Sequence, residues 1–241
     1  MGAVPDAGAD GVVGDWAIER LVGSAGELHS RPIGPTHGRL VAVLEVTAPA
    51  LVLGSTQPET DADVVALERA GIALARRRSG GGAVLLVPGE STWIDVTIAR
   101  DDPLSDDDVG RAFHWLGSAW MRAVARLDVR ATVHRGPLIV SPWSRRVCFA
   151  GIGAGEVLVD GRKLVGISQR RTREGVRFQS IVLRRWDPAP LLEVLALTDG
   201  ERADGVAALG DAATGLDVDT ETVAAALLGA LPSGGDDTDR H

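Results

Sequence analysis

Two side chains in this 241-residue sequence are candidates for catalysis because each is the sole residue of its type. Lys163 is the one lysine among 25 cationic residues, and Cys148 is the one cysteine. Lysine is a compact point charge on a flexible stem, whereas arginine is a planar fork. A cysteine thiolate is a nucleophile. The competing interpretations are a surface lysine retained by chance and a buried, unreactive cysteine.

A glycine-rich loop is the third candidate for chemistry. Gly80, Gly81 and Gly82 follow Arg77 and Ser79 in the segment ARRRSGGGAV. Glycines let the backbone approach a ligand, exposed N–H groups bind anions, and arginines bind carboxylate or phosphate. Residues typical of a β-strand follow, so the loop is neither a Walker A loop nor the glycine fingerprint that opens a helix. The competing interpretation is a solvated patch followed by a flexible turn.

Charge is unevenly distributed along the chain. The net charge is −8, yet residues 76–185 carry 19 Lys and Arg against 11 Asp and Glu, and both flanking segments are acidic. A basic middle segment favours an anionic small molecule such as a nucleotide. Nucleic acid is not expected as a partner, because the chain is acidic overall and has no Tyr for base stacking.

The composition is that of an ordinary globular protein, with 45% hydrophobic and 24% charged residues. The length suits one large core, and no linker divides it, so we expect a single catalytic domain over residues 11–231. Residues 1–10 are expected to be a flexible N-terminus and residues 232–241 a disordered acidic tail.

Several classes of protein and site are not expected. No apolar run approaches the roughly 20 residues that span a bilayer, and the first residues do not resemble a secretion signal, which favours a cytoplasmic protein without a membrane partner. One cysteine excludes an intramolecular disulfide and a zinc site with several cysteines. The five histidines lack metal-binding spacing, so no protein-built metal site is expected.

The elements that must hold these residues begin with short strands. Residues 39–54 read as two β segments broken near Pro49, because proline cannot donate to a ladder. Residues 61–71 form a short helix by their end signals. Strands follow over residues 83–87 and 92–99, after the glycine loop.

A long helix is expected next, with Ser105 as its N-cap, Asp108 three positions later and apolar residues at helical spacing. Residues 129–140 suggest a strand followed by an irregular stretch. Further helices are expected near residues 188–197, 201–209 and 219–231.

An Asp-Gly turn places Lys163. The segment VLVDGRKLVGIS reads as two strands joined by Asp160 and Gly161, a strong hairpin signal. Strict alternation after this turn puts Lys163 on one face with Val165 and Ile167.

Two of these segments resemble motifs of the lipoate-protein ligase A family, within the superfamily of biotin and lipoate ligases and octanoyltransferases. ARRRSGGGAV resembles the family's RRxSGGGAV motif, and VDGRKLVGISQRR resembles its second motif, which contains a lysine. A weaker match, APALVLGSTQPE, is similar to the family's early strand and G-x-x-Q turn. The resemblance covers most of residues 45–185.

The resemblance implies an α+β fold, with a mixed, largely antiparallel sheet flanked by helices, as in the class II synthetase-like catalytic domains of biotin and lipoate ligases. It implies that ATP, with Mg²⁺, converts lipoate or octanoate to an acyl-adenylate, and that Lys163 serves both the carboxylate and the α-phosphate. The acyl group then passes to a lysine of a lipoyl-carrier domain, such as glycine cleavage H protein or a 2-oxoacid dehydrogenase E2. The implied ATP and acyl contacts are Arg77, Ser79, Gly80, Gly81, Gly82, Ala83, Val84, Leu85, Glu156 and Lys163.

The sequence departs from the ligase pattern in two places. Leu85 and Leu86 stand where ligases usually have an aromatic residue and His, and Gly155 and Glu156 stand where they often have Asn-Asp. The main competing function is that of an octanoyltransferase, because in related thioester-forming transferases a Cys-Phe dipeptide, here at Cys148, precedes the lysine hairpin.

Two further functions stay open. One is that of a non-catalytic homologue that binds a lipoyl or biotinyl group, because the usual His after the glycine loop is missing. The second, biotin ligation, is less favoured, since the loop of biotin ligases usually reads GRGRxGR.

Overall fold

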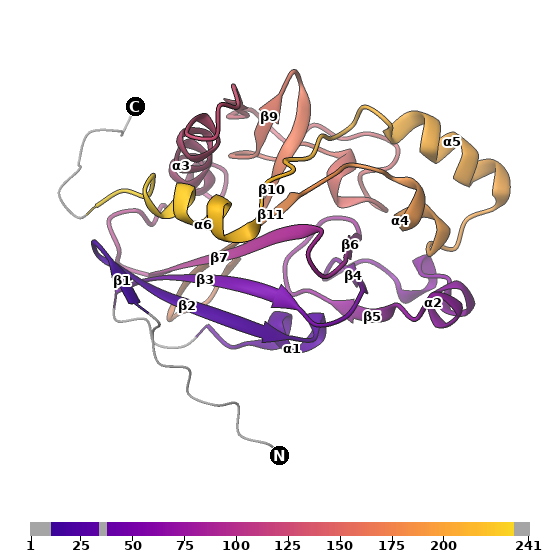
Figure 1. Ribbon diagram of the computed structural model, residues 1–241, viewed down its shortest axis with the longest axis horizontal. Helices are drawn as coiled ribbons and strands as arrows, with labels where there is room; N and C mark the ends of the chain where they lie inside the picture. Colours follow the sequence, from indigo (N-terminus) through magenta and orange to yellow (C-terminus); the bar gives the residue numbers. More distant parts are fainter. Residues whose placement is uncertain (1–10, 34–37, 234–241) are drawn as a thin grey trace, which may run out of the picture.

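The large sheet of the protein is built from strands far apart in the sequence (Figure 1). The computed structural model describes residues 11–33 and 38–233. Its strands are β1 (Gly11–Val13), β2 (Trp16–Gly23), β3 (Arg39–Val46), β7 (Ser91–Ala99), β8 (Thr132–Val133), β9 (Val157–Val159), β10 (Arg162–Arg171) and β11 (Gly175–Leu183). They lie in the order β1-β2-β3-β7-β11-β10-β9-β8, and every neighbouring pair is antiparallel except β2 and β3.

A smaller sheet lies beside the first. It comprises β4 (Ala50–Leu53), β5 (Ala73–Arg76) and β6 (Val84–Leu86). The central strand β4 runs parallel to β5 and antiparallel to β6. The predicted break near Pro49 is confirmed: β3 ends three residues before it, and the chain passes there from the large sheet to the small one.

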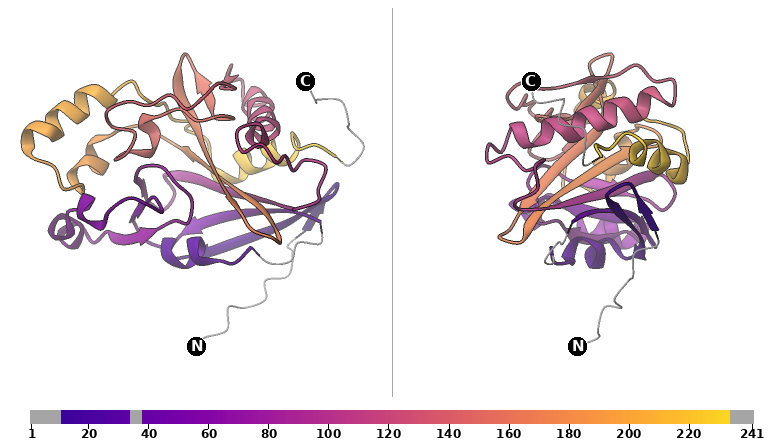
Figure 2. Two further views of the ribbon diagram at one scale, coloured as in Figure 1. Left: turned by 180° about the vertical axis from the view of Figure 1, so that it is seen from behind. Right: turned by 90° about the vertical axis from the view of Figure 1, so that its left-hand side faces the viewer.

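Helices flank both sheets. They are α1 (Ala25–Ser30), α2 (Val64–Ala70), α3 (His114–Ala125), α4 (Ala189–Glu193), α5 (Asp199–Leu209) and α6 (Thr220–Leu228). The 3₁₀ turns are η1 (Glu59–Asp61), η2 (Arg111–Phe113) and η3 (Cys148–Ala150). Helices α3 and α6 cover one face of the large sheet, and α1 and the small sheet lie on the other (Figure 2). The predicted α+β fold is confirmed.

The large sheet is buried on both faces, which explains its nearly continuous apolar strands. In β7, Ile94 and Val96 join the core under α3 and α6, whereas Trp93 faces the small sheet because successive side chains alternate. We call the apolar cluster between the two sheets the inter-sheet layer. Its buried members are Ala25, Leu28, Ala42, Leu44, Val46, Ala50, Val52, Val84, Leu86, Trp93, Phe149 and Ala213.

The predicted start of the long helix at Ser105 is wrong. Helix α3 begins at His114, after the turn η2. The carboxylate of Asp106 accepts the N–H of Asp108, and that of Asp108 accepts the N–H groups of Gly110 and Arg111. These local bonds satisfy the backbone in turns and compete with a helix.

The C-terminal part follows the sequence pattern more closely. Each of the three predicted helical stretches overlaps a helix, and α5 begins two residues before its predicted start. Thr198 and Glu201 form a capping box at the start of α5. The strand expected within residues 129–140 is reduced to the two residues of β8. The predictions for residues 1–10 and 234–241 lie outside the described residues. In the part of the chain that is described, no helix has the length and apolar character of a membrane span.

Helix α3 packs closely against the loop that precedes β9. A Cβ atom at Gly117 would collide with the carbonyl oxygen of Gly155 and lie 2.9 Å from the Val133 side chain. Gly155 itself has φ +79, which favours glycine. This approach fixes the backbone immediately before Glu156.

We expect Gly117→Ala to destabilise the protein by about 1–3 kcal/mol, since the added methyl group meets backbone that cannot yield cheaply. In α5, a Cβ at Gly200 meets nothing within 4 Å. Gly200→Ala should therefore leave stability unchanged or raise it by up to about 1 kcal/mol, as helix propensity predicts. Urea unfolding measures both variants, and a stabilised Gly117→Ala would contradict the described packing.

Candidate active site

The hairpin that carries Lys163 forms as predicted, but the Lys163 side chain lies on a different face of the strand from the predicted one. Asp160 and Gly161 have φ +50 and +77, and β9 pairs with β10 across them. A β-bulge lies between Lys163 and Val165. The predicted shared face of Lys163 and Val165 is therefore wrong, because the extra residue, Leu164, interrupts the alternation.

The bulge sends Lys163 toward the inter-sheet layer. Leu164 and Val165 both join the core on the helix side of the sheet. The Lys163 ammonium lies 5.5 Å from the centre of the Phe149 ring, and a Cβ at Gly166 would also contact that ring. Lys163 thus lies on the same face of the large sheet as Gly166.

Lys163 is 2% exposed and forms an ion pair with Glu156, with 2.7 Å between Nζ and Oε2. Its Nζ also donates to the carbonyl oxygen of Cys148 at 3.0 Å. Glu156 accepts further hydrogen bonds from the N–H groups of Gly153 at 2.7 Å and Ile167 at 3.1 Å. A buried charge pair is tolerated when its remaining hydrogen-bonding capacity is satisfied in this way. Three residues that the sequence singled out, Lys163, Glu156 and Cys148, therefore meet.

A C-terminal segment holds the backbone of Lys163. Its N–H donates to the carbonyl of Ala212 at 3.1 Å, and its carbonyl accepts the N–H of Thr214 at 2.9 Å. Sequence reasoning missed this contact, since no local signal marks residues about 50 positions further along as partners of β10.

The glycine loop lies against the backbone of Cys148. Ala83 donates its N–H to Arg146 at 2.8 Å and accepts the N–H of Cys148 at 2.9 Å. A Cβ at Gly82 would collide with the backbone nitrogen of Val147. Glycine is thus required here because the loop packs closely on the backbone of residues 146–147, whereas the predicted approach of the loop to a ligand stays a prediction.

Arg77 shapes the loop from inside. It is buried, and its Nη2 donates to the carbonyls of Gly80 at 2.8 Å and Gly82 at 2.7 Å, while Nη1 donates to Val52 at 3.3 Å. Among the described residues, no acceptor takes the N–H groups of Gly80, Gly81 or Gly82. Gly81 has φ +99. The loop therefore offers unpaired N–H groups, whereas its arginine fork is engaged by the protein itself.

A polar row runs along the same face of the large sheet. Ser79 accepts a hydrogen bond from Ser168 at 2.9 Å and donates to Gln179 at 3.3 Å. Ser79 was a predicted site residue, whereas Ser168 and Gln179 were not. Arg177 and Gln179, two positions apart in the otherwise apolar part of β11, carried the signal for a polar face.

Asp95 extends this row as a buried acid that the sequence suggested only as a strand residue. Its carboxylate accepts the Trp93 indole N–H at 2.7 Å and lies 3.7 Å from Arg177 Nε. Burial raises the pKa of Asp95 to about 6, against the charge of Arg177. His29, whose ring centre is 4.2 Å from that of Trp93, has its pKa lowered to about 3 by burial and then by the charges of Arg77 and Arg177. It is neutral at pH 7.

The residues after the glycine loop fill the apolar interior. Val84 and Leu86 are buried in the inter-sheet layer, and Leu85 faces the other way, toward the core under α4 and α5. Cys148 is half-buried and packs against the same layer. Leu86 thus makes this layer apolar where the ligase pattern has His.

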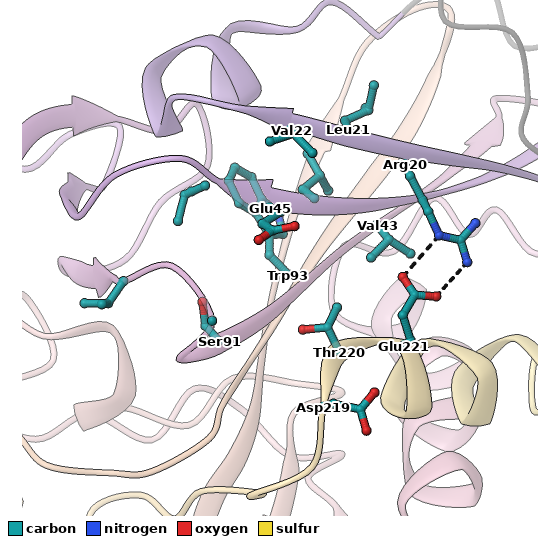
Figure 3. A pocket seen from close by; sticks show the side chains of 14 residues that line it. Arg20, Leu21, Val22, Val43, Glu45, Ser91, Trp93, Asp219, Thr220 and Glu221 are labelled. Atoms are coloured by element: carbon teal, nitrogen blue, oxygen red, sulfur yellow. Dashed lines mark hydrogen bonds and ion pairs between the residues drawn. The ribbon is translucent and has the colours of Figure 1, made fainter.

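A cavity of about 270 Å³ lies elsewhere, between β2, β3, β7 and the start of α6 (Figure 3). The ion pair of Arg20 and Glu221, 2.7 Å long, forms part of its wall. None of the predicted site residues lines it. In residues 11–33 and 38–233, no group of three or more His, Cys, Asp or Glu side chains is placed to hold a metal ion.

Comparison with known proteins identifies the family. Residues 28–231 match the family described as lipoyl protein ligase A/B catalytic domain. The chain belongs to this family. It is 28% identical over 152 residues to octanoyltransferase LipM of Kyrpidia tusciae, and the alignment spans 61% of this chain and 55% of that relative.

Solved structures share the fold of this lipoyl ligase family member. The bipartite lipoate protein ligase of Thermoplasma acidophilum, solved in a study with its E2 lipoyl domain, has a TM-score of 0.68 at 17% identity, over 88% of this chain and 81% of that one. A lipoate protein ligase from the same organism with bound lipoic acid has a TM-score of 0.62 at 17% identity, over 85% and 76%. At these identities the likeness establishes the fold alone.

We expect Glu156→Gln and Lys163→Met each to cost about 3–5 kcal/mol of stability, because each leaves one buried partner without its counter-charge. The double variant should lose at least about 1 kcal/mol less than the sum of the two. Guanidinium unfolding measures this cycle. The exposed pair of Arg184 and Asp217, 2.7 Å apart, is the control, and Asp217→Asn should cost under about 1 kcal/mol. Additive losses at Lys163 and Glu156 would contradict the coupling.

Acid should destabilise the protein partly through His29. Unfolded histidine, with a pKa near 6.5, gains a proton between pH 7 and 5, whereas folded His29, with a pKa of about 3, does not. The free energy of unfolding therefore decreases as the pH is lowered from 7 to 5, and His29→Gln should remove about 2 kcal/mol of that decrease. Asp95 acts in the opposite direction, since its raised pKa favours the folded state as pH falls, but it is common to both proteins and cancels. Unfolding at both pH values tests this, and an equal fall in both proteins would contradict it.

Proposed function

We propose that this chain transfers an octanoyl or lipoyl group to a lysine of a lipoyl-carrier domain through a thioester on Cys148. The observation that carries this proposal is the hydrogen bond from Lys163 Nζ to the Cys148 carbonyl at 3.0 Å, which brings the sole lysine and the sole cysteine together. Similarity to a protein named octanoyltransferase supports the same class of reaction.

In the first step, the Cys148 thiolate attacks the carbonyl of an acyl thioester, and the donor thiolate leaves and takes up a proton. In the second, the uncharged amine of the carrier lysine attacks the Cys148 thioester, the new C–N bond forms, the amine loses a proton and the Cys148 thiolate leaves. Each step places negative charge on the carbonyl oxygen. The N–H groups of Gly80 to Gly82 and the Lys163 ammonium are suited to stabilise that charge.

ATP-dependent lipoate ligation is the second candidate. The unpaired N–H groups of Gly80 to Gly82 favour it, because such a loop also suits phosphate. Ser79 and the glycine backbone would contact the acyl-phosphate junction, and Mg²⁺ would be held largely by the ATP phosphates. We rank ATP-dependent ligation second because the Arg77 guanidinium donates to carbonyls of its own loop and is therefore not open to a phosphate.

The decisive measurement is the intact mass after incubation with an octanoyl thioester of a carrier protein. We expect one acyl adduct that is lost in Cys148→Ala, because the chain has no other thiol. Lys163→Met should slow formation of the adduct by about 10²–10³, the usual effect of removing one group that stabilises an oxyanion. An unmodified wild-type mass would exclude the thioester route.

A parallel assay tests the ligase. Wild type with ATP, Mg²⁺ and lipoate should show no exchange of pyrophosphate into ATP if the thioester route is correct. Exchange that persists in Cys148→Ala would establish ligation instead. Neither exchange nor an adduct with lipoate, octanoate or biotin would indicate a non-catalytic homologue.

A further inference from the structure

Three consecutive apolar side chains face water close to the candidate active site. Leu138, Ile139 and Val140 are 65%, 50% and 68% exposed. A run of exposed apolar residues is unfavourable on a surface that stays in water, unless it is covered by a partner. The run is therefore a candidate docking surface.

The backbone of this run is fixed to the site. Ile139 exchanges two hydrogen bonds with Ile152, at 2.8 and 2.9 Å, four residues after Cys148. On the other side, the N–H of His134 donates to the carbonyl of Glu156 at 2.9 Å. The exposed side chains thus stand on a backbone that is already ordered, which lowers the entropy cost of binding.

The surrounding segment is cationic. Residues 129–155 contain four arginines and no Asp, Glu or Lys, although the whole chain has a net charge of −8. Arg130, Arg135 and Arg145 are exposed, and Arg135 Nη2 also donates to Ser118 Oγ at 2.9 Å. Arg146 pairs with Glu201 at 3.4 Å. A partner that complements this surface has apolar side chains rimmed by carboxylates.

We propose that Leu138, Ile139 and Val140 dock the carrier domain whose lysine receives the acyl group, with Arg135 and Arg145 facing its acidic rim. This inference rests on the proposed function, because only an acceptor has to bring a lysine to Cys148. A second copy of this chain fits less well, since a two-fold contact would bring the same arginines together.

Binding without chemistry tests the surface. The probes are an apo E2 lipoyl domain and apo glycine cleavage H protein, titrated calorimetrically into wild type and Leu138→Ser/Val140→Ser. We expect Kd to rise at least about tenfold in the double variant, as for loss of two buried apolar contacts. Val64→Ser/Val65→Ser, on α2, is the matched control, with side chains 54% and 63% exposed and no expected change in Kd.

Charge and chemistry provide two more readouts. Arg135→Gln/Arg145→Gln should weaken binding and reduce its dependence on NaCl. Once acylated, Leu138→Ser/Val140→Ser should show a raised KM for the carrier domain. Its acyl group should still pass to hydroxylamine at the wild-type rate, because hydroxylamine needs no docking surface.

The outcomes separate this inference from the proposed function. Wild-type Kd in a folded Leu138→Ser/Val140→Ser, or no binding of either carrier by wild type, overturns the docking surface even if Cys148 is acylated. Binding that the double variant loses, in a protein whose Cys148 never forms an acyl adduct, supports the surface and rejects the thioester route.

Discussion

The arrangement around the candidate site depends on keeping one buried ammonium group neutralised. Lys163 is 2% exposed, and an unpaired charge at such a position costs several kcal/mol. Its partner Glu156 must therefore be held at 2.7 Å, which requires the hydrogen bonds from Gly153 and Ile167. The close approach of α3 at Gly117 fixes the chain just before that carboxylate. The β-bulge at Leu164, the packing of α3 and the loop before Glu156 therefore all help to hold the Glu156 carboxylate against the Lys163 ammonium.

The two cationic side chains near the site, Arg77 and Lys163, make different contacts because their charged groups differ in shape. Arg77 uses its planar fork on two carbonyls of its own loop, which sets the loop in place and leaves the N–H groups of Gly80 to Gly82 unpaired. Lys163, a point charge, reaches one carbonyl oxygen and one carboxylate. The glycine loop is thus held by its own arginine, and the buried Lys163 ammonium is held beside the backbone of Cys148.

The region between the two sheets is apolar in one part and polar in another. Phe149 of η3 and Leu86 of β6 are apolar members near Cys148, whereas Asp95 of β7 and His29 of α1 are buried polar residues near Trp93. Burial raises the pKa of Asp95 to about 6 and lowers that of His29 to about 3, so at pH 7 the carboxylate is mostly ionised beside Arg177, whereas the imidazole is neutral. Solved lipoate ligases share the fold at 17% identity.

The sequence by itself determined the features set by neighbouring residues: the Asp160-Gly161 turn, the glycine loop, the break between β3 and β4, and the capped helices of the C-terminal part. Turn and cap preferences act over a few positions, so they are legible without the fold. Tertiary structure decided the side on which Lys163 lies, because a bulge breaks alternation without a sequence signal, and it moved the start of α3 to His114. It also decided that residues 212–214 hold the lysine strand, since that pairing joins segments that only the packed sheet brings together.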